Sequence, residues 1–455
     1  MATSYKIQID PDNCGLMGYK CDEVAATKVS ELLQKDLVNH HVFFTAKGFH
    51  NHMVHHLLTI YGTGGNSEAL QNAFDMDSSF QAATVTPHSG VFEELQSNWT
   101  NAHKYLGKVN HYPDFLRFFQ SEVEKKGWQQ VVLEYLLGDT ESAEELFNRS
   151  WSSFAHSLIQ LMYGIEWEQP AIIAEALAQA AIHDDYVGNF LSKVEKAAAA
   201  DPSKMSLTLP ELLEQVHSDE DFINSVRHDN PNAILDGVEV FCPDEAIAYL
   251  SRIKIDPDDM EERVAENIHT AAYMASASVF HPPHLPRYDF FLIHHLTLAP
   301  ILLLLGPATW IPETVKHRIL EWKSRFDILQ YVARWCPPLQ IESVANYTPH
   351  DDSLVGSTEE LLPRFNSKPD DGHVVKVARA LVIAQRNSQK YRDRPWIRIK
   401  DDVTWLKAMY ILLDSTILVH SGFPWVRSAG WNEAWEDSGY PKGFQTLPRA
   451  TMATS

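Results

Sequence analysis

The sequence GFHNHMVHHLLTIYGTGG occupies residues 48–65 and shows the pattern that recurs along the chain. Phe49, Met53, Leu57 and Tyr61 follow one another at every fourth position, which is the spacing of one face of an α-helix. Three glycines follow at positions 62, 64 and 65, and glycine commonly ends a helix because it accepts a left-handed backbone. The stretch therefore predicts a helix that carries several histidines among apolar residues.

The same helical spacing extends outward in both directions. Strand-like alternation is scarce, few βαβ units can be drawn, and no internal repeat of fixed period is found. Helices are predicted over residues 23–39, 115–136, 143–163, 170–181, 261–278, 290–305, 313–334, 372–386 and 403–420. Residues 201–231, with an embedded short helix, and residues 349–371 read as long loops.

These patterns predict an all-α protein with a large, multi-helix, bundle-like single domain and long loops. The helical domain is expected over residues 22–440, after an irregular segment at 1–21 and before a C-terminal tail at 441–455. A chain of 455 residues with 45% hydrophobic residues can bury a sizeable core.

Composition excludes several classes of protein. A net charge of −22 argues against nucleic-acid binding, which needs a basic surface. No apolar run approaches the roughly 18 residues of a membrane helix, and the N-terminus lacks a secretory signal. We therefore expect a cytoplasmic protein without membrane partners. The four cysteines form no CxxC pair, and no dinucleotide fingerprint, P-loop or nucleophile elbow is present.

Histidine is the residue type that stands out, with 22 copies, many of them in apolar helical segments. His52 and His56 are four residues apart and share a helix face, which suits two ligands of one metal. Met53 stands where a zinc peptidase would need Glu. Any one of these histidines could instead be a core residue bonded to a carbonyl, but several buried imidazoles in one apolar helix are hard to satisfy.

Other histidines lie in similar apolar surroundings. His156 stands in an apolar helical segment, and His294 and His295 are adjacent, so only one of them can face a given site. His183 and Asp185 form an H-x-D pair as in iron/2-oxoglutarate enzymes, but those are β-barrels and this context is helical. A histidine at a helix C-terminus is also favourable without a metal.

Residues 372–381, GHVVKVARAL, place His373 and Lys376 three residues apart on one helix face. Apolar neighbours should desolvate Lys376 and favour its neutral amine. A neutral amine reacts with carbon dioxide to give a carbamate, which can bind metal through oxygen. The alternative is that Lys376 extends to water or pairs with a carboxylate.

The segments FHNHMVHHLLTIYGTGG, AHSLIQLMYGIEWEQPAIIAEALAQAAIHDD, YDFFLIHHLT and DDGHVVKVARAL together resemble the questin oxidase-like family. The resemblance spans about residues 30–435, including the C-terminal GWNEAWED. It implies a mostly helical enzyme that uses molecular oxygen to open a ring of a fungal anthraquinone or related aromatic polyketide, with a Baeyer–Villiger outcome. Some members are NADPH-dependent, and at least one resembles a non-haem iron dioxygenase with four histidines and a carboxylated lysine.

The resemblance also implies a site. The ligands and catalytic residues expected from it are His56, His156, His294 and His373, with Lys376 as a carbamate, and His52 and His183 are held in reserve. The family often has a second histidine four residues after the one that matches His156. Gln160 stands there in this chain, so it is expected to support the ligands rather than to bind metal.

We expect ferrous iron as cofactor, because imidazole and carboxylate-type ligands suit it. Residues expected to line a flat apolar pocket are Phe49, Tyr163, Trp167, Tyr288, Phe290 and Phe291, although each of them alone is better explained by core packing. One alternative is a metal-free, NADPH-linked Baeyer–Villiger oxidase in which the histidines act as acids and bases. Another is a non-catalytic helical binding protein. The oligomeric state is left open.

Overall fold

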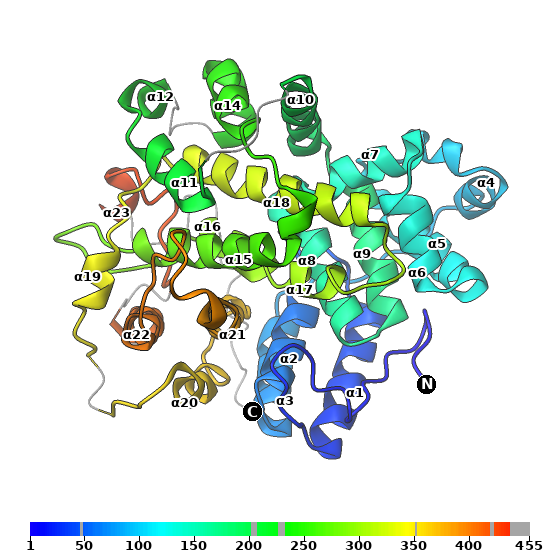
Figure 1. Cartoon of the computed structure of the whole chain (residues 1–455). Coiled ribbons are helices and arrows are strands. Elements are labelled where there is room, and N and C mark those ends of the chain that lie inside the picture. The colour runs from blue at the N-terminus through cyan, green and yellow to red at the C-terminus, as the bar shows by residue number, and fades with distance from the viewer. Residues whose placement is uncertain (46–48, 202–206, 226–232, 351–352, 419–422, 437–455) are drawn as a thin grey trace.

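The chain folds into helices joined by turns and by longer loops (Figure 1). This computed structural model describes residues 1–45, 49–201, 207–225, 233–350, 353–418 and 423–436. Within those ranges the extended backbone makes only isolated bridges and no sheet. The predicted all-α, single-domain fold is confirmed, while the predicted tail at 441–455 lies outside the described residues.

The helices follow one another through the whole described chain. In the N-terminal half they are α1 (Glu23–Asn39), α2 (Met53–Gly62), α3 (Ser67–Ser78), α4 (Val91–Ser97), α5 (Tyr112–Lys126), α6 (Trp128–Val132), α7 (Glu141–Ser150), α8 (Ser152–Glu166), α9 (Pro170–Ile182), α10 (Tyr186–Ala200), α11 (Leu209–His217) and α12 (Glu220–Ser225). In the C-terminal half they are α13 (Glu239–Phe241), α14 (Pro243–Leu250), α15 (Met260–Ala277), α16 (Leu292–Leu298), α17 (Ile301–Leu305), α18 (Glu313–Ala333), α19 (Ile341–Ala345), α20 (Thr358–Leu361), α21 (His373–Ser388), α22 (Asp402–Leu418) and α23 (Glu433–Glu436). Short 3-10 or π turns are η1 (Trp99–Lys104), η2 (Val109–His111), η3 (Leu133–Leu137), η4 (Ala233–Val238), η5 (Pro257–Asp259), η6 (Leu362–Phe365) and η7 (Gln389–Tyr391).

Three predicted helices are each divided in the structure. The helix predicted over 115–136 breaks at Gly127, whose φ of 81° only glycine adopts readily. The one predicted over 143–163 breaks after Ser150, and the one over 290–305 breaks at Pro300, which lacks an amide hydrogen. Both predicted long loops are partly helical, since α11 and α12 lie in 201–231 and α20 lies in 349–371.

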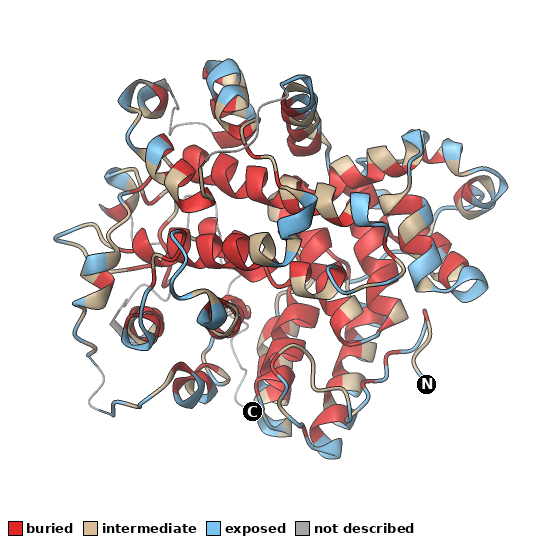
Figure 2. Cartoon of the chain, in the orientation of Figure 1, coloured by how far each residue is buried: buried red, intermediate tan, exposed pale blue. Residues whose placement is uncertain are grey.

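Four helices from distant parts of the sequence form a closed ring near the middle of the molecule. Helix α2 packs against α8 and α21, and α16 packs against the same two helices. All ten residues of α2 are buried, as expected for a helix that is apolar on every side. Surrounding helices cover the ring: α1 and α3 contact α2, α9 contacts α8, and α15 contacts α16 and α21. The buried centre is visible in Figure 2.

One glycine allows two helices of the ring to approach closely. Gly372 caps α21 with a φ of +86°, and a Cβ added there would lie 2.5 Å from Cβ of His56 on α2. Any larger residue would force the two helices apart and strain the backbone. Among the described helices, none is both long enough and apolar enough to span a bilayer.

Candidate metal centre

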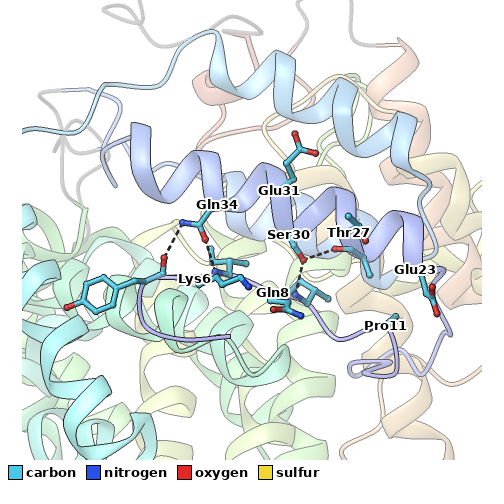
Figure 3. A pocket seen from close by; sticks show the side chains of 12 residues that line it. Lys6, Gln8, Pro11, Glu23, Thr27, Ser30, Glu31 and Gln34 are labelled. Atoms are coloured by element: carbon cyan, nitrogen blue, oxygen red, sulfur yellow. Dashed lines mark hydrogen bonds between the residues drawn. The ribbon is translucent and has the colours of Figure 1, made fainter. Parts of the chain in front are cut away.

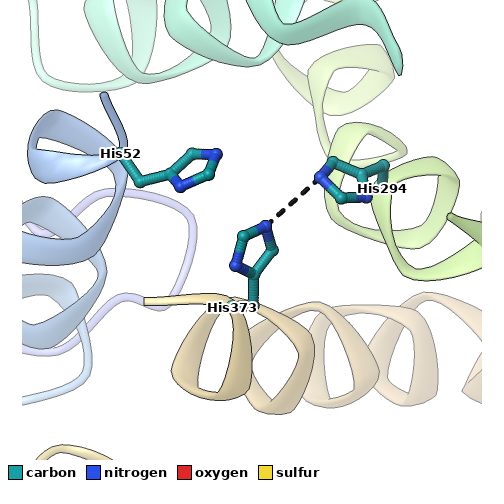
Figure 4. Close-up of side chains that lie close together, drawn as sticks. All are labelled: His52, His294 and His373. Atoms are coloured by element: carbon teal, nitrogen blue, oxygen red, sulfur yellow. Dashed lines mark hydrogen bonds between the residues drawn. The ribbon is translucent and has the colours of Figure 1, made fainter. Parts of the chain in front are cut away.

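Each helix of the ring brings one histidine to its centre from the region where the helix begins. His52 is the N-cap of α2, and His373 is the first residue of α21. His294 lies in the first turn of α16, and His156 lies in α8 just after its distorted start. All four are buried, with exposures between 1% and 7%. Figure 4 shows the rings of His52, His294 and His373 pointing toward one another from three separate helices.

The four rings meet through their Nε2 atoms. Nε2 of His52 lies 3.0 Å from Nε2 of His156, and Nε2 of His373 lies 3.2 Å from Nε2 of His294. Ring nitrogens of His52, His294 and His373 all lie within 4.8 Å of one another. Ligands bound at right angles to a metal at about 2.1 Å are separated by about 3.0 Å, so these distances fit a shared cation.

A single carboxylate orients two of these rings. Oδ1 of Asp371 lies 2.5 Å from Nδ1 of His373, and Oδ2 lies 3.1 Å from Nδ1 of His52. A carboxylate that is ionised only accepts hydrogen bonds, so both histidines carry their proton on Nδ1. Burial opposes the charge on Asp371, but the two histidines hold its pKa well below the usual range. Asp371 therefore leaves both Nε2 atoms with free lone pairs.

Backbone carbonyls orient the other two rings in the same way. Nδ1 of His156 donates to the carbonyl of Ser153 at 2.5 Å, and Nδ1 of His294 donates to that of Phe290 at 2.7 Å. All four Nε2 atoms are thus acceptors that face each other without a proton between them. Such facing lone pairs repel unless a cation lies among them, and an oxygen partner on the far nitrogen is typical of metal-bound histidine.

Electrostatics also favour neutral imidazoles. Burial lowers the pKa of His156, His294 and His373, and lowers that of His52 to about 3. Neutral imidazole is the form that binds metal. The residues present therefore fit a transition-metal ion whose main ligands are imidazoles, and iron is one of the metals that such ligands suit.

Lys376 lies one turn beyond His373 on α21 and belongs to the same environment. Its positive charge contributes to lowering the pKa of all four histidines of the centre. The residue is 3% exposed. Burial lowers the pKa of Lys376 to about 8, although Asp371, Asp370 and Asp77 partly oppose this shift. A neutral, buried amine next to the centre is what carbamate formation requires, and whether Lys376 is carboxylated stays a prediction.

The structure separates His56 from the four facing rings. Nδ1 of His56 lies 2.9 Å from Oδ2 of Asp77, and both residues are buried. Burial disfavours the charged ring, but Asp77 outweighs this effect and the pKa of His56 is raised. His56 was expected among the ligands and His52 in reserve, whereas the geometry brings His52 to the centre and pairs His56 with Asp77. Which of the two binds metal stays a prediction.

The other reserve residues lie beside the centre. Nε2 of His183 lies 2.9 Å from Nε2 of His50, whose ring stacks on His156 with centroids 3.9 Å apart. Asp185, the partner of His183 in the H-x-D pair, pairs with Arg149 at 3.5 Å instead.

Gln160 and His55 complete the surroundings of the centre. The amide of Gln160 donates to Oε2 of Glu175 at 3.1 Å, and burial raises the pKa of Glu175 well above its usual value. His55 is fully buried, stacks on Tyr163 at 5.3 Å and leaves both ring nitrogens without a hydrogen bond in the described structure. The neighbouring His295 pairs with Asp327 at 2.8 Å, so of the adjacent pair only His294 faces the centre.

Sequence reasoning missed Asp371, the residue that connects two of the facing histidines. The signal was present, because the acidic pair at 370–371 directly precedes Gly372 and His373. A carboxylate two residues before a candidate ligand is a natural partner for its Nδ1. The role of Asp77 was not visible, since 21 residues separate it from His56.

We expect Asp371→Asn to weaken metal binding about 10- to 100-fold, the usual effect of removing a partner that orients a ligand. The asparagine side chain has a single accepting oxygen and no negative charge. It therefore cannot give each imidazole its own acceptor, as the two carboxylate oxygens of Asp371 do. The test is to remove bound metal from each protein and then to measure its metal affinity by competition with a chelator. Asp370→Asn is the matched control, and equal losses in both variants would contradict the role given to Asp371.

A left-handed turn precedes His156. Ser153, Phe154 and Ala155 have φ values of 50°, 56° and 56°, which non-glycine residues rarely adopt in succession. Each costs roughly 1–2 kcal/mol relative to right-handed backbone. The turn aims the carbonyl of Ser153 at Nδ1 of His156 and places the ring of Phe154 5.6 Å from that of His294. Strain of this kind is concentrated at functional sites.

Replacing Ser153 with glycine should stabilise the protein by about 1 kcal/mol, because glycine adopts positive φ without a steric penalty. Chemical denaturation measures this change in the free energy of unfolding. Ser157→Gly is the control: Ser157 lies in right-handed helix, so glycine there should destabilise by a similar amount. A loss of stability in both variants would argue against the left-handed turn.

Two of the predicted pocket aromatics lie on the partly exposed side of the centre. The ring centroid of Phe290 lies 5.1 Å from that of His294 and 5.0 Å from that of His373. Phe291 contacts Phe154 at 4.8 Å. These rings form an aromatic surface beside His294 and His373.

The other predicted pocket residues lie elsewhere or serve other contacts. The hydroxyl of Tyr163 bonds to Thr59 at 2.6 Å, while that of Tyr288 donates to the carbonyl of Ala408 at 3.0 Å. Trp167 packs beneath Gly15 and Gly62, where a Cβ would meet its ring. Phe49 contacts Phe44. Tyr288 and Trp167 therefore have the surroundings of core residues.

A groove of about 670 Å³ lies elsewhere, between the N-terminal segment and α1 (Figure 3). Its lining includes Ile7, Ile9, Ser30 and Gln34, and the backbone of Ile7 donates to the side chain of Gln34. None of the facing histidines lines it. The groove therefore has no part in the chemistry of the histidine centre.

Comparison with known proteins places the chain in a family. The family model described as questin oxidase-like matches residues 49–381. The chain is 32% identical to a questin oxidase of Aspergillus terreus, over 96% of this chain and 98% of the relative. It is 32% identical to a Baeyer–Villiger oxidase of Emericella nidulans, over 90% and 93%. It is 33% identical to a Baeyer–Villiger monooxygenase of Aspergillus aculeatus, over 90% of each chain. The chain thus belongs to the questin oxidase-like family, a family of oxidoreductases.

Proposed function

We propose that this protein is a non-haem iron oxygenase that uses molecular oxygen to open a ring of an anthraquinone-type aromatic polyketide. The observation that carries the proposal is the set of four neutral imidazoles from four helices, each held through Nδ1 by an oxygen acceptor and facing the others through Nε2. We take His52, His156, His294 and His373 as the iron ligands. The carbamate of Lys376 supplies an oxygen ligand.

The residues around the centre have distinct roles in this proposal. Bound iron supplies the ability to activate molecular oxygen beside the substrate. Asp371 fixes the tautomer and orientation of His52 and His373. Burial of the four helix starts excludes bulk water, which strengthens every electrostatic interaction inside the site.

The lowered pKa of Lys376 makes the carbamate accessible under mild conditions. With a pKa of about 8, its neutral fraction near pH 7 is about 300 times that of an ordinary lysine. Carbon dioxide then adds to Nζ, one proton leaves, and an anionic carbamate forms. Its negative charge offsets that of the cation among four neutral imidazoles.

The aromatic surface beside the centre supports a flat, phenolic substrate. Phe290 lies beneath the guanidinium of Arg427 at 4.9 Å, and Phe291 beneath that of Arg334 at 4.2 Å. Both arginines are largely desolvated, and burial lowers the pKa of each to about 10, so they remain charged near neutral pH. A planar ring with acidic hydroxyl groups would stack on the phenylalanines and be stabilised as a phenolate by the arginines.

A metal-free, NADPH-linked Baeyer–Villiger oxidase is the second candidate, and the names of several relatives agree with the Baeyer–Villiger part of it. The two reactions differ in their electron balance. A monooxygenase puts one oxygen atom into the product and reduces the other to water with two electrons from NADPH. A dioxygenase leaves both atoms in the product and needs no external reductant.

The deciding experiment uses protein stripped of metal and then reloaded with ferrous iron, with an anthraquinone and oxygen-18 gas. Turnover without NADPH, dependent on iron and with two labelled atoms in the product, would support the proposal. Turnover of the stripped protein with NADPH and one labelled atom would establish the metal-free oxidase. If no anthraquinone causes oxygen consumption under either condition, the catalytic proposal fails and a binding protein becomes the better description.

A further inference from the structure

A second cluster of potential metal ligands lies outside the four-helix ring. His88 lies in the segment between α3 and α4, His111 ends η2, and Asp114 stands in the first turn of α5. One nitrogen from each histidine and one carboxylate oxygen lie within 4.8 Å of one another. None of these residues belongs to the helices that bring the facing histidines together.

One carboxylate oxygen is the centre of this cluster. Oδ2 of Asp114 lies 2.8 Å from Nδ1 of His88 and 2.7 Å from Nδ1 of His111. The other oxygen, Oδ1, accepts the backbone N–H of His88 at 2.6 Å, which fixes the orientation of the carboxylate. The centroids of the two imidazole rings lie 4.5 Å apart, and the ring planes are tilted by 37°. Both imidazoles thus donate an Nδ1 hydrogen to one carboxylate oxygen, and three atoms that can bind a metal are gathered in one place.

The buried carboxylate is held by hydrogen bonds rather than by a lysine or an arginine. Asp114 is completely buried, and in the described parts of the chain no lysine or arginine forms an ion pair with it. Its charge is offset by hydrogen bonds from two imidazoles and one amide. A divalent cation that binds Oδ2 and the two Nδ1 atoms would displace both Nδ1 hydrogens and compensate the carboxylate in their place.

We propose that His88, His111 and Asp114 form a second metal site that binds a divalent transition metal of the zinc class. Two imidazole nitrogens and one carboxylate oxygen are a donor set that such ions accept. Ligands of a tetrahedral ion at about 2.0–2.1 Å are about 3.4 Å apart, so the three atoms need to separate by several tenths of an ångström. The side chain of His88 is 44% exposed, which allows that movement and leaves an open position for water.

The consequence of metal binding there is structural. The cation would connect the segment between α3 and α4 to the start of α5, and α5 packs against α9, which in turn packs against α8. Because ligand binding to the folded state alone stabilises it, zinc should raise the melting temperature. This site is separate from the histidine centre, so it does not depend on the proposed oxygenase reaction.

The experiment titrates zinc and cobalt(II) into stripped protein by calorimetry and visible absorption, in a His373→Ala background that disables the central site. The expected result is about one tightly bound ion per chain, a cobalt spectrum of low-symmetry coordination, and a zinc-dependent rise in melting temperature. His88→Gln in the same background should lose all three. The matched control is His103→Gln, because His103 is exposed and lies outside the cluster.

Binding of the same number of ions by the His88→Gln and His103→Gln proteins, with the same rise in melting temperature, would overturn the second site. Absence of any bound ion in the His373→Ala background would overturn it as well. His88 is the most exposed of the three ligands, so its glutamine variant should fold, and circular dichroism in the presence of a chelator verifies this. Failure of the central iron site changes none of these outcomes, because the central site is already disabled.

Discussion

Replacing His52 with glutamine should remove the bound metal and lower kcat at least about 100-fold, while replacing His56 with glutamine should leave the metal in place. His52 faces His156 through Nε2 at 3.0 Å, whereas His56 is engaged with Asp77. Loss of a direct ligand should exceed the 10- to 100-fold effect of losing a residue that only orients one. Metal content by plasma mass spectrometry and oxygen consumption measure the two effects.

The two variants form a matched pair, because the same change is made one helical turn apart. His56→Gln should instead cost stability, about 3–5 kcal/mol, since it leaves the buried carboxylate of Asp77 without its charged partner. Denaturation of the metal-free proteins should show this loss for His56→Gln and a much smaller one for His52→Gln. The opposite pattern, with metal lost only in His56→Gln, would return His56 to the ligand set and remove His52 from it.

Replacing Lys376 with methionine should abolish turnover and stabilise the metal-free protein. A buried amine, whose charged form burial disfavours, is replaced by an uncharged chain of similar length. Activity should fall at least about 100-fold, because methionine cannot form a carbamate. Lys376→Arg is the control for charge, since it keeps a cation but also cannot be carboxylated.

The stability effect has a definite pH dependence. The folded pKa of Lys376, about 8, lies below the value of 10.5 in the unfolded chain. Below pH 8 both states are protonated, and the folded state bears the full cost of the buried charge, on the order of 3 kcal/mol. Between about pH 8 and 10.5 the unfolded state binds more protons, so stability should rise with pH. Denaturation without carbon dioxide should show this rise in the wild type and not in Lys376→Met.

Carboxylation can be observed directly. In carbon-13 bicarbonate, the wild-type protein should show a carbamate carbon signal that is absent from Lys376→Met. Its intensity should increase when iron or another divalent metal is added, because the metal stabilises the anion. A signal of equal size in both proteins would assign the carbamate to another amine and remove Lys376 from the ligand set.

Much of the fold was predictable because it depends on local periodicity. Predicted and observed bounds agree for α1, since Asp22 accepts a hydrogen bond from the amide of Ala25 and starts the helix where the sequence suggests. The divided helices were not foreseen. The break before His156 depends on three residues with positive φ that carry no glycine signal, so only tertiary packing holds them there.

The candidate site was only partly predictable. His156, His294 and His373 were singled out from their apolar surroundings and from the family resemblance, and the structure brings them together. Spacing alone could not choose between His52 and His56, because both lie on one face of the same helical segment. The choice depends on Asp77 and Asp371, which come from α3 and from the residues just before α21.

The sequence by itself determined that the chain is helical, that its histidines lie in apolar segments and that one lysine shares a helix face with a histidine. These are properties of residue type and spacing within one segment, which neighbouring residues set. Only the tertiary structure decided which nitrogen of each ring faces inward and which histidine pairs with an acid. Those outcomes depend on contacts between residues up to 319 positions apart, as for His52 and Asp371, and only packing brings such residues together.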